Sequence, residues 1–276
     1  SGDPVRAGGG KGANVAVAAA RDGADVRLVV ALGDDDLGAA TRAELRAEGV
    51  GTGGVTTLED RPTGLAMICV EPDGENFIVV APGANAALAT SHVASGLADF
   101  GDDDVCVVNF EIPEEAITAA VEHVKRARGR MVMNPSPVRS IDGLVTEHTT
   151  LVVNAGELAH LTDTSDIAAG AEKLKREGAR DVVVTKGPDG VHVLTHDGEH
   201  HGLDAFPATS KDTTGAGDTF TGVLAGAIAA GAELTDAARR GAAAAALSTE
   251  QIGARSAMPR TADTDRLLAA GARRPL

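Results

Sequence analysis

Apolar, β-branched runs alternate along the chain with segments whose apolar residues recur at helical spacing. Short continuous runs such as VCVVN and DVVVT are typical of strands buried on both faces. The predicted strands span residues 26–32, 64–71, 77–81, 105–109, 130–134, 151–154, 182–185 and 191–195. The predicted helices span residues 12–21, 37–48, 91–97, 113–126, 167–177, 216–230, 235–249 and 263–270. This alternation predicts an α/β fold with a doubly wound, mainly parallel sheet flanked by helices.

One stretch departs from the alternation. Between residues 62 and 82 two strands follow each other without a helix, joined by Pro72-Asp73-Gly74. A turn of this kind between two apolar runs predicts a β-hairpin, which we expect to project as a small β lid. We expect residues 1–276 to form a single α/β domain, with a solvent-exposed hairpin tip at Glu199-His200-His201.

The amino-acid composition disfavours several classes of protein. The 276 residues are 43% hydrophobic and 24% charged, which is typical of a globular chain, and no run approaches the length of a transmembrane helix. The net charge of −15 disfavours nucleic acid or an anionic membrane as a partner, and the aromatic content of 2% leaves few side chains on which bases could stack. Two cysteines form no disulfide framework, so we expect a cytoplasmic protein.

The strongest chemical signal is the motif DTTGAGDTF at residues 212–220, which begins an alanine-rich helix. Gly215 and Gly217 allow a tight turn that exposes backbone N–H groups at the helix N-terminus, an arrangement that binds anions such as phosphate. Asp218 lies in the same turn, where a carboxylate could accept the proton of a hydroxyl that attacks a phosphate. The spacing agrees equally well with a second interpretation, in which Asp218 caps the helix.

A second glycine-rich motif, GGGKGAN, occupies residues 8–14. It matches the loose pattern of dinucleotide-binding folds, but the strand that must precede such a loop is missing. It is not a phosphate-binding Walker loop either, because Gly12 stands where Ser or Thr is required. Lys11 and Asn14 place two hydrogen-bond donors on a loop that a ligand can approach closely, which suits a polyhydroxyl ligand.

Three further polar groups follow predicted strands, where open α/β sheets bind their ligands. They are residues 109–111, Asn154-Ala155-Gly156-Glu157 and Thr185-Lys186-Gly187. Glu157 could orient a hydrated Mg²⁺, but the pattern taken alone favours a helix cap with a glutamate in the first turn. The chain has no G-x-S-x-G elbow and no HExxH spacing, which favours phosphoryl transfer over hydrolysis.

Together these motifs resemble the ribokinase-like family of carbohydrate kinases, over nearly the whole chain. The GGKGAN run at residues 9–14 is similar to one signature of that family, and residues 212–220 are similar to the more specific one. The segments GENFIVVAPGAN at 74–85, FEIP at 110–113 and NPSP at 134–137 agree with the same resemblance.

The resemblance implies ATP-dependent phosphorylation of D-ribose at its 5-hydroxyl, with Asp218 as the base and an anion hole at Gly215, Ala216 and Gly217. It implies that the sugar is held by Gly10, Lys11, Gly12, Asn14, Glu111 and Asp218. It assigns ATP binding to Asn154, Thr185, Lys186, Gly187, Pro188, Asp189, Gly190 and Gly217, and Mg²⁺ to Glu157. It also implies a K⁺ site formed by Asp212, Thr214, Ser248, Gln251 and Gly253.

The chain departs from the family pattern in two places. A side-chain ligand of the family's cation site falls at Ala257, and the residue expected beside adenine falls near Ala242. Only seven residues precede Gly8, where the family has a core strand with a sugar-binding Asp and a lid strand. We therefore expect either that these residues are not the whole natural protein, or that the chain self-associates through the lid edge. The loss of that strand should leave the apolar face of residues 26–32 partly bare.

Two alternatives to ribose phosphorylation stay open at this stage. One is a kinase for another small sugar, or for a nucleoside, although the scarcity of aromatic residues disfavours a nucleoside. The other is a sugar- or nucleotide-binding relative without catalysis, which the missing N-terminal Asp favours and the presence of Asp218 opposes. The expected partners are D-ribose, ATP and, in a homodimer, a second copy of the chain.

Overall fold

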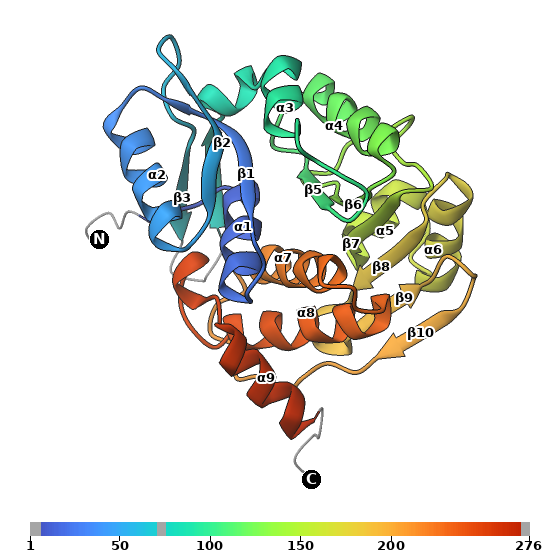
Figure 1. Ribbon diagram of the computed structural model, residues 1–276. Helices are drawn as coiled ribbons and strands as arrows, with labels where there is room; N and C mark the ends of the chain where they lie inside the picture. The colour runs from blue at the N-terminus through green and yellow to red at the C-terminus, as the bar shows by residue number, and fades with distance from the viewer. Residues whose placement is uncertain (1–6, 71–75, 272–276) are drawn as a thin grey trace.

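The structure, a computed structural model, describes residues 7–70 and 76–271 (Figure 1). Its largest sheet has six strands in the order β10-β9-β8-β7-β6-β5. The bounds are β5 (Val105–Asn109), β6 (Arg130–Asn134), β7 (Thr149–Asn154), β8 (Asp181–Thr185), β9 (Val191–Leu194) and β10 (His200–Leu203). Strands β5 to β8 are parallel and the last two pairings are antiparallel, which confirms the predicted mainly parallel α/β sheet.

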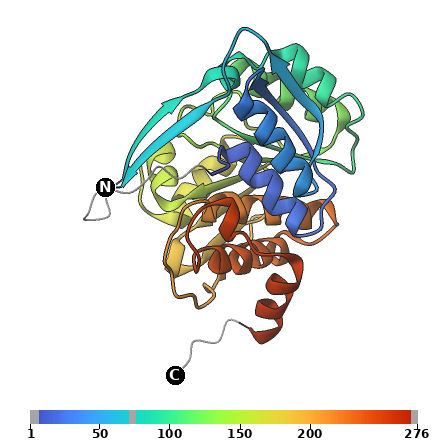
Figure 2. The same cartoon turned by 90° about the vertical axis from the view of Figure 1, so that its left-hand side faces the viewer.

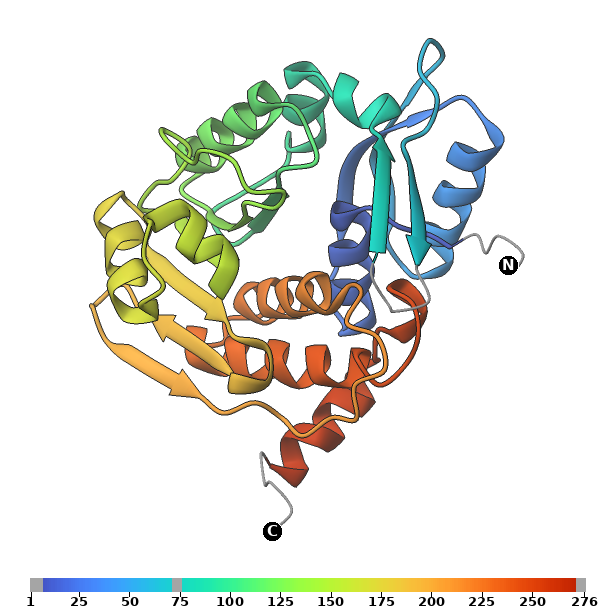
Figure 3. The ribbon, with the colours of Figure 1, turned by 180° about the vertical axis from the view of Figure 1, so that it is seen from behind.

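Helices cover both faces of this sheet (Figures 1 and 3). One face packs against α4 (Glu114–Ala127), α5 (Ala155–Thr162) and α6 (Ile167–Arg176), and the other against α7 (Ala216–Ala229) and α8 (Leu234–Ser248). Successive residues of one strand face opposite layers: Met131 and Met133 join the first core, whereas Val132 joins the second together with Phe220. Two peripheral helices, α3 (Thr90–Gly96) and α9 (Thr261–Ala270), pack against α4 and α8 respectively.

A second, smaller sheet is formed by β1 (Arg27–Gly33) and β2 (Gly51–Leu58), which pair in parallel. Helices α1 (Lys11–Arg21) and α2 (Asp36–Ala47) pack on it, and Asp35 caps α2 through a bond from the Gly38 N–H. Within the described residues this pair shares no hydrogen-bonded strand with the six-stranded sheet. Leu28, Ala31 and Leu32 are buried, whereas Val29 and Val30 in the middle of β1 are half-buried, which agrees with the expectation of partly bare apolar residues in this strand.

The predicted hairpin is present as β3 (Leu65–Val70) and β4 (Asn76–Ala81), which pair antiparallel with Leu65 opposite Ala81. The turn predicted at Pro72-Asp73-Gly74 lies outside the described residues. The hairpin projects away from the helices and the large sheet (Figure 2). Four apolar side chains on it are largely exposed: Leu65, Met67, Val79 and Val80.

The predicted elements include neither β2 nor α5, although a helix cap at Asn154 is among the predictions. The predicted hairpin tip at residues 199–201 is wrong in position, because the chain already reverses at Thr195–Glu199 and His200 begins β10. Short 3-10 turns form at η1 (Gly83–Ala87), η2 (Gly187–Asp189) and η3 (Arg255–Ala257). Among the helices described here, none combines the length and the apolar character that a bilayer crossing requires.

Candidate active site

The candidate site is built around Asp218, which lies in the first turn of α7. Gly215 has a φ of 78° and begins the helix in a left-handed conformation that a residue with a Cβ rarely adopts. No side chain caps this helix. The carboxylate of Asp218 points instead toward α1 and is buried, so the interpretation of Asp218 as a helix cap does not describe its contacts.

Helix α1 supplies the two polar partners of Asp218. The Asn14 Nδ2 donates to Oδ2 of Asp218 at 2.8 Å, and the Lys11 Nζ lies 3.7 Å from the other carboxylate oxygen. The two helices approach closely where they pack, because a Cβ on Gly222 would lie 2.4 Å from the Val15 carbonyl oxygen. This close packing is what brings residues from the two signature motifs into contact.

Glu111 joins the same cluster from the loop after β5. Its Oε2 accepts a hydrogen bond of 2.8 Å from the Lys11 backbone N–H, and its own N–H donates to Oδ1 of Asn109 at 3.0 Å. The residues predicted to hold a sugar therefore lie around one point: Gly10, Lys11, Gly12 and Asn14 at the start of α1, with Glu111 and Asp218 facing them.

The surroundings of Asp218 shift its pKa in opposite directions. Burial of the carboxyl raises its pKa above the ordinary value, because the charged form is less well solvated. The positive charge of Lys11, the hydrogen bond from Asn14 and the more distant charge of Arg255 each lower that pKa. A partly desolvated carboxylate held by donors is well suited to accept a proton from a substrate hydroxyl near neutral pH.

The predicted anion hole lies in the turn that precedes Asp218. The Ala216 N–H donates to the Thr213 carbonyl at 3.1 Å, and the Thr219 N–H donates to the Gly215 carbonyl at 2.8 Å. Among the hydrogen bonds of the described residues, none is made by the N–H groups of Gly215 and Gly217. These two donors at a helix N-terminus are the ones open to an anion.

The residues predicted to bind ATP gather mainly in one pocket at the carboxyl ends of β7 and β8. The pocket has a volume of about 390 Å³ and is lined by Asn154, Ala155, Gly156, Ile167, Thr185, Lys186, Gly187 and Asp189. Pro188 and Gly190 belong to the adjoining turn, where the Lys186 N–H donates to the Gly190 carbonyl at 2.8 Å, but they do not line the pocket. Gly217 lies elsewhere, in the turn before Asp218.

Asn154 and Glu157 form a reciprocal capping box at the start of α5. Oδ1 of Asn154 accepts from the Glu157 N–H at 2.8 Å, and Oε2 of Glu157 accepts from the Asn154 N–H at 2.9 Å. The second carboxylate oxygen of Glu157 has no partner among the described residues. A free carboxylate oxygen on the residue that follows Gly156 of this pocket agrees with the predicted Mg²⁺ ligand, because Mg²⁺ is commonly held by one or two carboxylates, substrate phosphates and water.

The predicted K⁺ site joins two loops. Asp212 accepts from the Thr214 N–H at 2.9 Å and from the Gly253 N–H at 2.8 Å, and the hydroxyl of Thr214 is the main cause of the lowered pKa of this carboxyl. Ser248 is buried at the end of α8, and the Thr249 carbonyl accepts from the Lys211 N–H at 2.7 Å. An Asp212 carboxylate kept ionised beside the residues after α8 agrees with the predicted monovalent cation.

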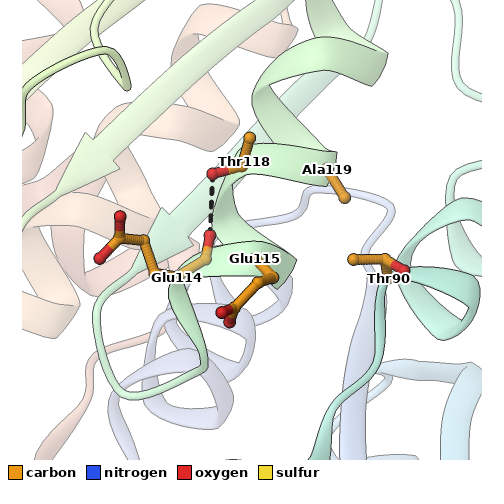
Figure 4. Close-up of a pocket in the computed structure, with 5 residues that line it drawn as sticks. All are labelled: Thr90, Glu114, Glu115, Thr118 and Ala119. Atoms are coloured by element: carbon orange, nitrogen blue, oxygen red, sulfur yellow. Dashed lines mark hydrogen bonds between the residues drawn. The ribbon is translucent and has the colours of Figure 1, made fainter.

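A further pocket, between the beginnings of α3 and α4, contains none of the predicted site residues (Figure 4). It is lined by Thr90, Glu114, Glu115, Thr118 and Ala119. The two glutamates lie in the first turn of α4, where negative charge is favoured by the helix dipole, and the Thr118 hydroxyl donates to the Glu114 carbonyl at 3.0 Å. These contacts are explained by the helix alone.

Sequence reasoning missed one residue of the site, Arg255. Its side chain reaches the cluster from η3 and its Nε donates to Oδ1 of Asn14 at 3.0 Å. No motif or spacing signals this contact, because 241 residues separate the two positions and only the packing of η3 on α1 joins them.

The fold and the site define a class of enzyme. Residues 2–261 match the model of the pfkB family of carbohydrate kinases, and the chain belongs to that family. It is therefore a kinase that transfers phosphate to a carbohydrate, and the resemblance seen in the motifs is confirmed.

Within that family the similar proteins include several ribokinases and, at 32% identity, the deoxyribokinases of Salmonella typhi and Salmonella typhimurium. The ribokinase of Bacillus subtilis is 35% identical over 261 residues, covering 94% of this chain and 87% of that protein. The ribokinase of Haemophilus influenzae is 33% identical over 262 residues, covering 93% and 85%. The structure of Arabidopsis thaliana ribokinase complexed with ribose and ATP superposes with a TM-score of 0.85 at 27% identity, covering 94% of this chain and 87% of that one.

Proposed function

We propose that this chain transfers the γ-phosphoryl group of ATP to the 5-hydroxyl of D-ribose. The observation that carries the proposal is the buried Asp218 in the first turn of α7, held by Lys11 and Asn14 beside two open backbone donors. The similarity to ribokinases, one of them complexed with ribose and ATP, supports ribose as the substrate.

Asp218 acts as the general base. Its carboxylate accepts the proton of the sugar hydroxyl while that oxygen attacks the γ-phosphorus, and the bond between the γ-phosphorus and the bridging oxygen of ADP breaks. Lys11 and Asn14 hold the carboxylate in place and lower its pKa against the effect of burial. Removal of a general base of this kind lowers the rate by about 10²–10⁴-fold.

The N–H groups of Gly215 and Gly217 stabilise the negative charge of the phosphoryl group during transfer. They are fixed by the turn at the start of α7, so they need no rearrangement when charge develops. The Ala216 N–H belongs to the same predicted anion hole, but it would have to leave the Thr213 carbonyl before it could contribute.

The sugar lies between the start of α1 and Glu111. Glu111 offers a carboxylate oxygen as acceptor, and Lys11 and Asn14 offer donors, which together match the hydroxyl groups of a pentose. Gly10 has a φ of 85°, which a residue with a Cβ rarely adopts, and a Cβ on Gly12 would lie 3.3 Å from Nδ2 of Asn109, so the two glycines let this loop approach the residues after β5 closely.

ATP binds in the pocket at the ends of β7 and β8, which is lined by Asn154, Thr185, Lys186, Gly187 and Asp189 among others, with Pro188 and Gly190 in the adjoining turn. Glu157 would hold Mg²⁺ through its free carboxylate oxygen, and the ion supplies charge neutralisation on the ATP phosphates. Asp212, Thr214, Ser248, Gln251 and Gly253 would hold K⁺, which would tie the loop before the anion hole to the loop after α8.

The hairpin at residues 62–82 contributes the lid over the sugar and the contact between two copies of the chain, within one α/β domain of residues 1–276. Exposed apolar side chains on β3 and β4 support this assignment, since Val80 is 65% exposed and Met67 is 58% exposed. A cytoplasmic location stays a prediction based on the two cysteines.

A panel of acceptors tests the proposed substrate. ATP consumption is coupled to a reporter and measured with D-ribose, 2-deoxy-D-ribose, D-fructose and adenosine, and the position of the new phosphate is read by ³¹P NMR. We expect the highest kcat/KM with D-ribose and a phosphate on its 5-hydroxyl. A higher kcat/KM with another acceptor would assign the enzyme to that sugar instead.

A further inference from the structure

Arg255 is an almost buried cation that the reaction described above does not use. It begins η3 and is 9% exposed. Its Nε donates to Oδ1 of Asn14 at 3.0 Å, its Nη2 donates to the Gly9 carbonyl, and its Nη1 lies 3.6 Å from Oε2 of Glu44. One guanidinium thus contacts both the loop before α1 and the side chain that holds Asp218.

The contact with Asn14 determines which end of its amide faces Asp218. A guanidinium only donates hydrogen bonds and an ionised carboxylate only accepts them. Asn14 therefore must present Oδ1 to Arg255 and Nδ2 to Asp218, which is the arrangement observed. In the opposite orientation the amide oxygen would face the carboxylate and both hydrogen bonds would be lost.

The backbone that carries Arg255 is itself fixed on α1. The Nη1 of Arg21 donates to the carbonyls of Arg255 and Met258, each at 2.7 Å. The remaining nitrogens of Arg21 are held by Glu48, with Nε at 2.8 Å and Nη2 at 2.6 Å from its two oxygens. The guanidinium of Arg255 consequently starts from a fixed point and has little freedom to leave Asn14.

We propose that Arg255 is a positioning residue, which orients Asn14 so that the amide holds Asp218 and which fixes the Gly9 carbonyl in the sugar-binding loop before substrates arrive. The proposal rests on the proposed function, because it assigns Arg255 a part in the same phosphoryl transfer. Arg255 acts through Asn14 and makes no described hydrogen bond to Asp218 itself.

The charge of Arg255 adds a second effect on the same carboxyl. The groups that act on Asp218 are Lys11 and Asn14 from α1 and Arg255 from η3, and all three lower its pKa while burial raises it. Loss of Arg255 removes its charge and frees the Asn14 amide to rotate. The titration of Asp218 should therefore move to higher pH.

A double-mutant cycle tests the proposal. Arg255→Met should lower kcat with the sugar by about tenfold or more, as expected when a reacting group loses its alignment. In an Asn14→Ala background the same substitution should lower kcat by a clearly smaller factor, because the Asn14 contact is already absent and only the Gly9 contact and the charge of Arg255 are lost. An equal loss in both backgrounds, or an undiminished kcat in Arg255→Met, would overturn the proposal.

Two further variants keep this test decisive. Arg260→Met is the matched control, because Arg260 follows the same turn, faces Glu48 at 3.8 Å and has a 70% exposed side chain, so kcat should stay unchanged. Arg255→Lys keeps the positive charge but loses the guanidinium fork, and the cycle is run with it if Arg255→Met does not fold. A Lys variant with the kcat of the wild type in a folded protein would overturn the proposal as well.

A measurement without turnover separates this inference from the proposed function. The carboxyl ¹³C resonance of Asp218, assigned by its loss in Asp218→Asn, is titrated in the wild type, Arg255→Met and Arg260→Met. We expect a higher midpoint only in Arg255→Met, and an unchanged midpoint there would count against the positioning role. If the wild type phosphorylates no sugar, the proposed function fails, while the titration still decides the role of Arg255.

Discussion

The amide nitrogen of Asn14 lies 2.8 Å from a carboxylate oxygen of Asp218, although 204 residues separate them in the chain. Replacement of Asn14 by Ala removes a hydrogen bond to a charged, buried group, a bond worth about 1.5–3 kcal/mol. We expect weaker D-ribose binding and little change in ATP binding, both measured by calorimetry. Unchanged ribose affinity together with weaker nucleotide binding would contradict the assignment of this loop to the sugar.

Lys11 should affect the pH profile as well as sugar binding. Burial raises the pKa of Asp218 and the charge of Lys11 lowers it, so Lys11→Met should raise that pKa further. Because the base must be ionised, the acid limb of kcat/KM should move to higher pH. The shift is measured from pH profiles of the wild type and variant, with Lys125→Met as the control outside the site. Identical acid limbs would show that Lys11 does not act on the base.

Asp218→Asn should remove activity without lowering stability. The folded state raises the pKa of this carboxyl, so its ionised form is disfavoured by folding at neutral pH. The stability linked to its protonation is present at low pH and is lost as pH rises through the folded-state pKa. We therefore expect the Tm of Asp218→Asn to equal or exceed that of the wild type at pH 7.5, and the difference to shrink toward pH 4. A large drop in Tm at pH 7.5 would show that ionised Asp218 is a structural requirement.

One substitution separates the two roles of Glu157, which caps α5 and would also bind Mg²⁺. Gln can still accept the Asn154 N–H in the capping box but carries no charge for Mg²⁺. Glu157→Gln should raise the Mg²⁺ concentration needed for half-maximal rate and leave the Tm unchanged, whereas Asn154→Ala should cost about 1 kcal/mol of stability. An unchanged Mg²⁺ requirement in Glu157→Gln would remove Glu157 from the metal site.

The loop that contains Asp212 should respond to potassium. One carboxylate oxygen of Asp212 accepts from the Thr214 N–H and the other from the Gly253 N–H, so this side chain connects the two loops. Asp212→Asn should abolish the increase in kcat that KCl produces over tetramethylammonium chloride in the wild type, since the charge that attracts the cation is gone. Equal activity of the wild type in the two salts would contradict the presence of a K⁺ site.

The order of elements could be predicted because buried strands such as β8 and helices such as α7 carry a strong apolar signal. Strand β2 escaped prediction because its sequence, GTGGVTTL, has two apolar side chains in eight residues and owes its conformation to pairing with β1. Strand β10 is four residues long and starts with two histidines, so local preference gave no indication of a strand.

The site was predictable wherever a motif carries the chemistry. Asp218 and Lys11 lie in glycine-rich motifs whose backbone geometry has a recognisable pattern, and packing of α1 on α7 brings them together. Arg255 has no such pattern, since its contact depends on where η3 packs. At Asn154 and Glu157 the motif alone does not identify the function, because the same two residues form a capping box and are also predicted to bind ATP and Mg²⁺.

Phosphoryl transfer to ribose by way of Asp218 is the central property proposed for this enzyme. The decisive measurement is ³¹P NMR of the purified chain with D-ribose, ATP and Mg²⁺ in potassium buffer, compared with Asp218→Asn at equal concentration. We predict D-ribose 5-phosphate and ADP from the wild type, and a rate lower by about 10²–10⁴-fold in the variant. Formation of the same product at an undiminished rate by Asp218→Asn would contradict the account.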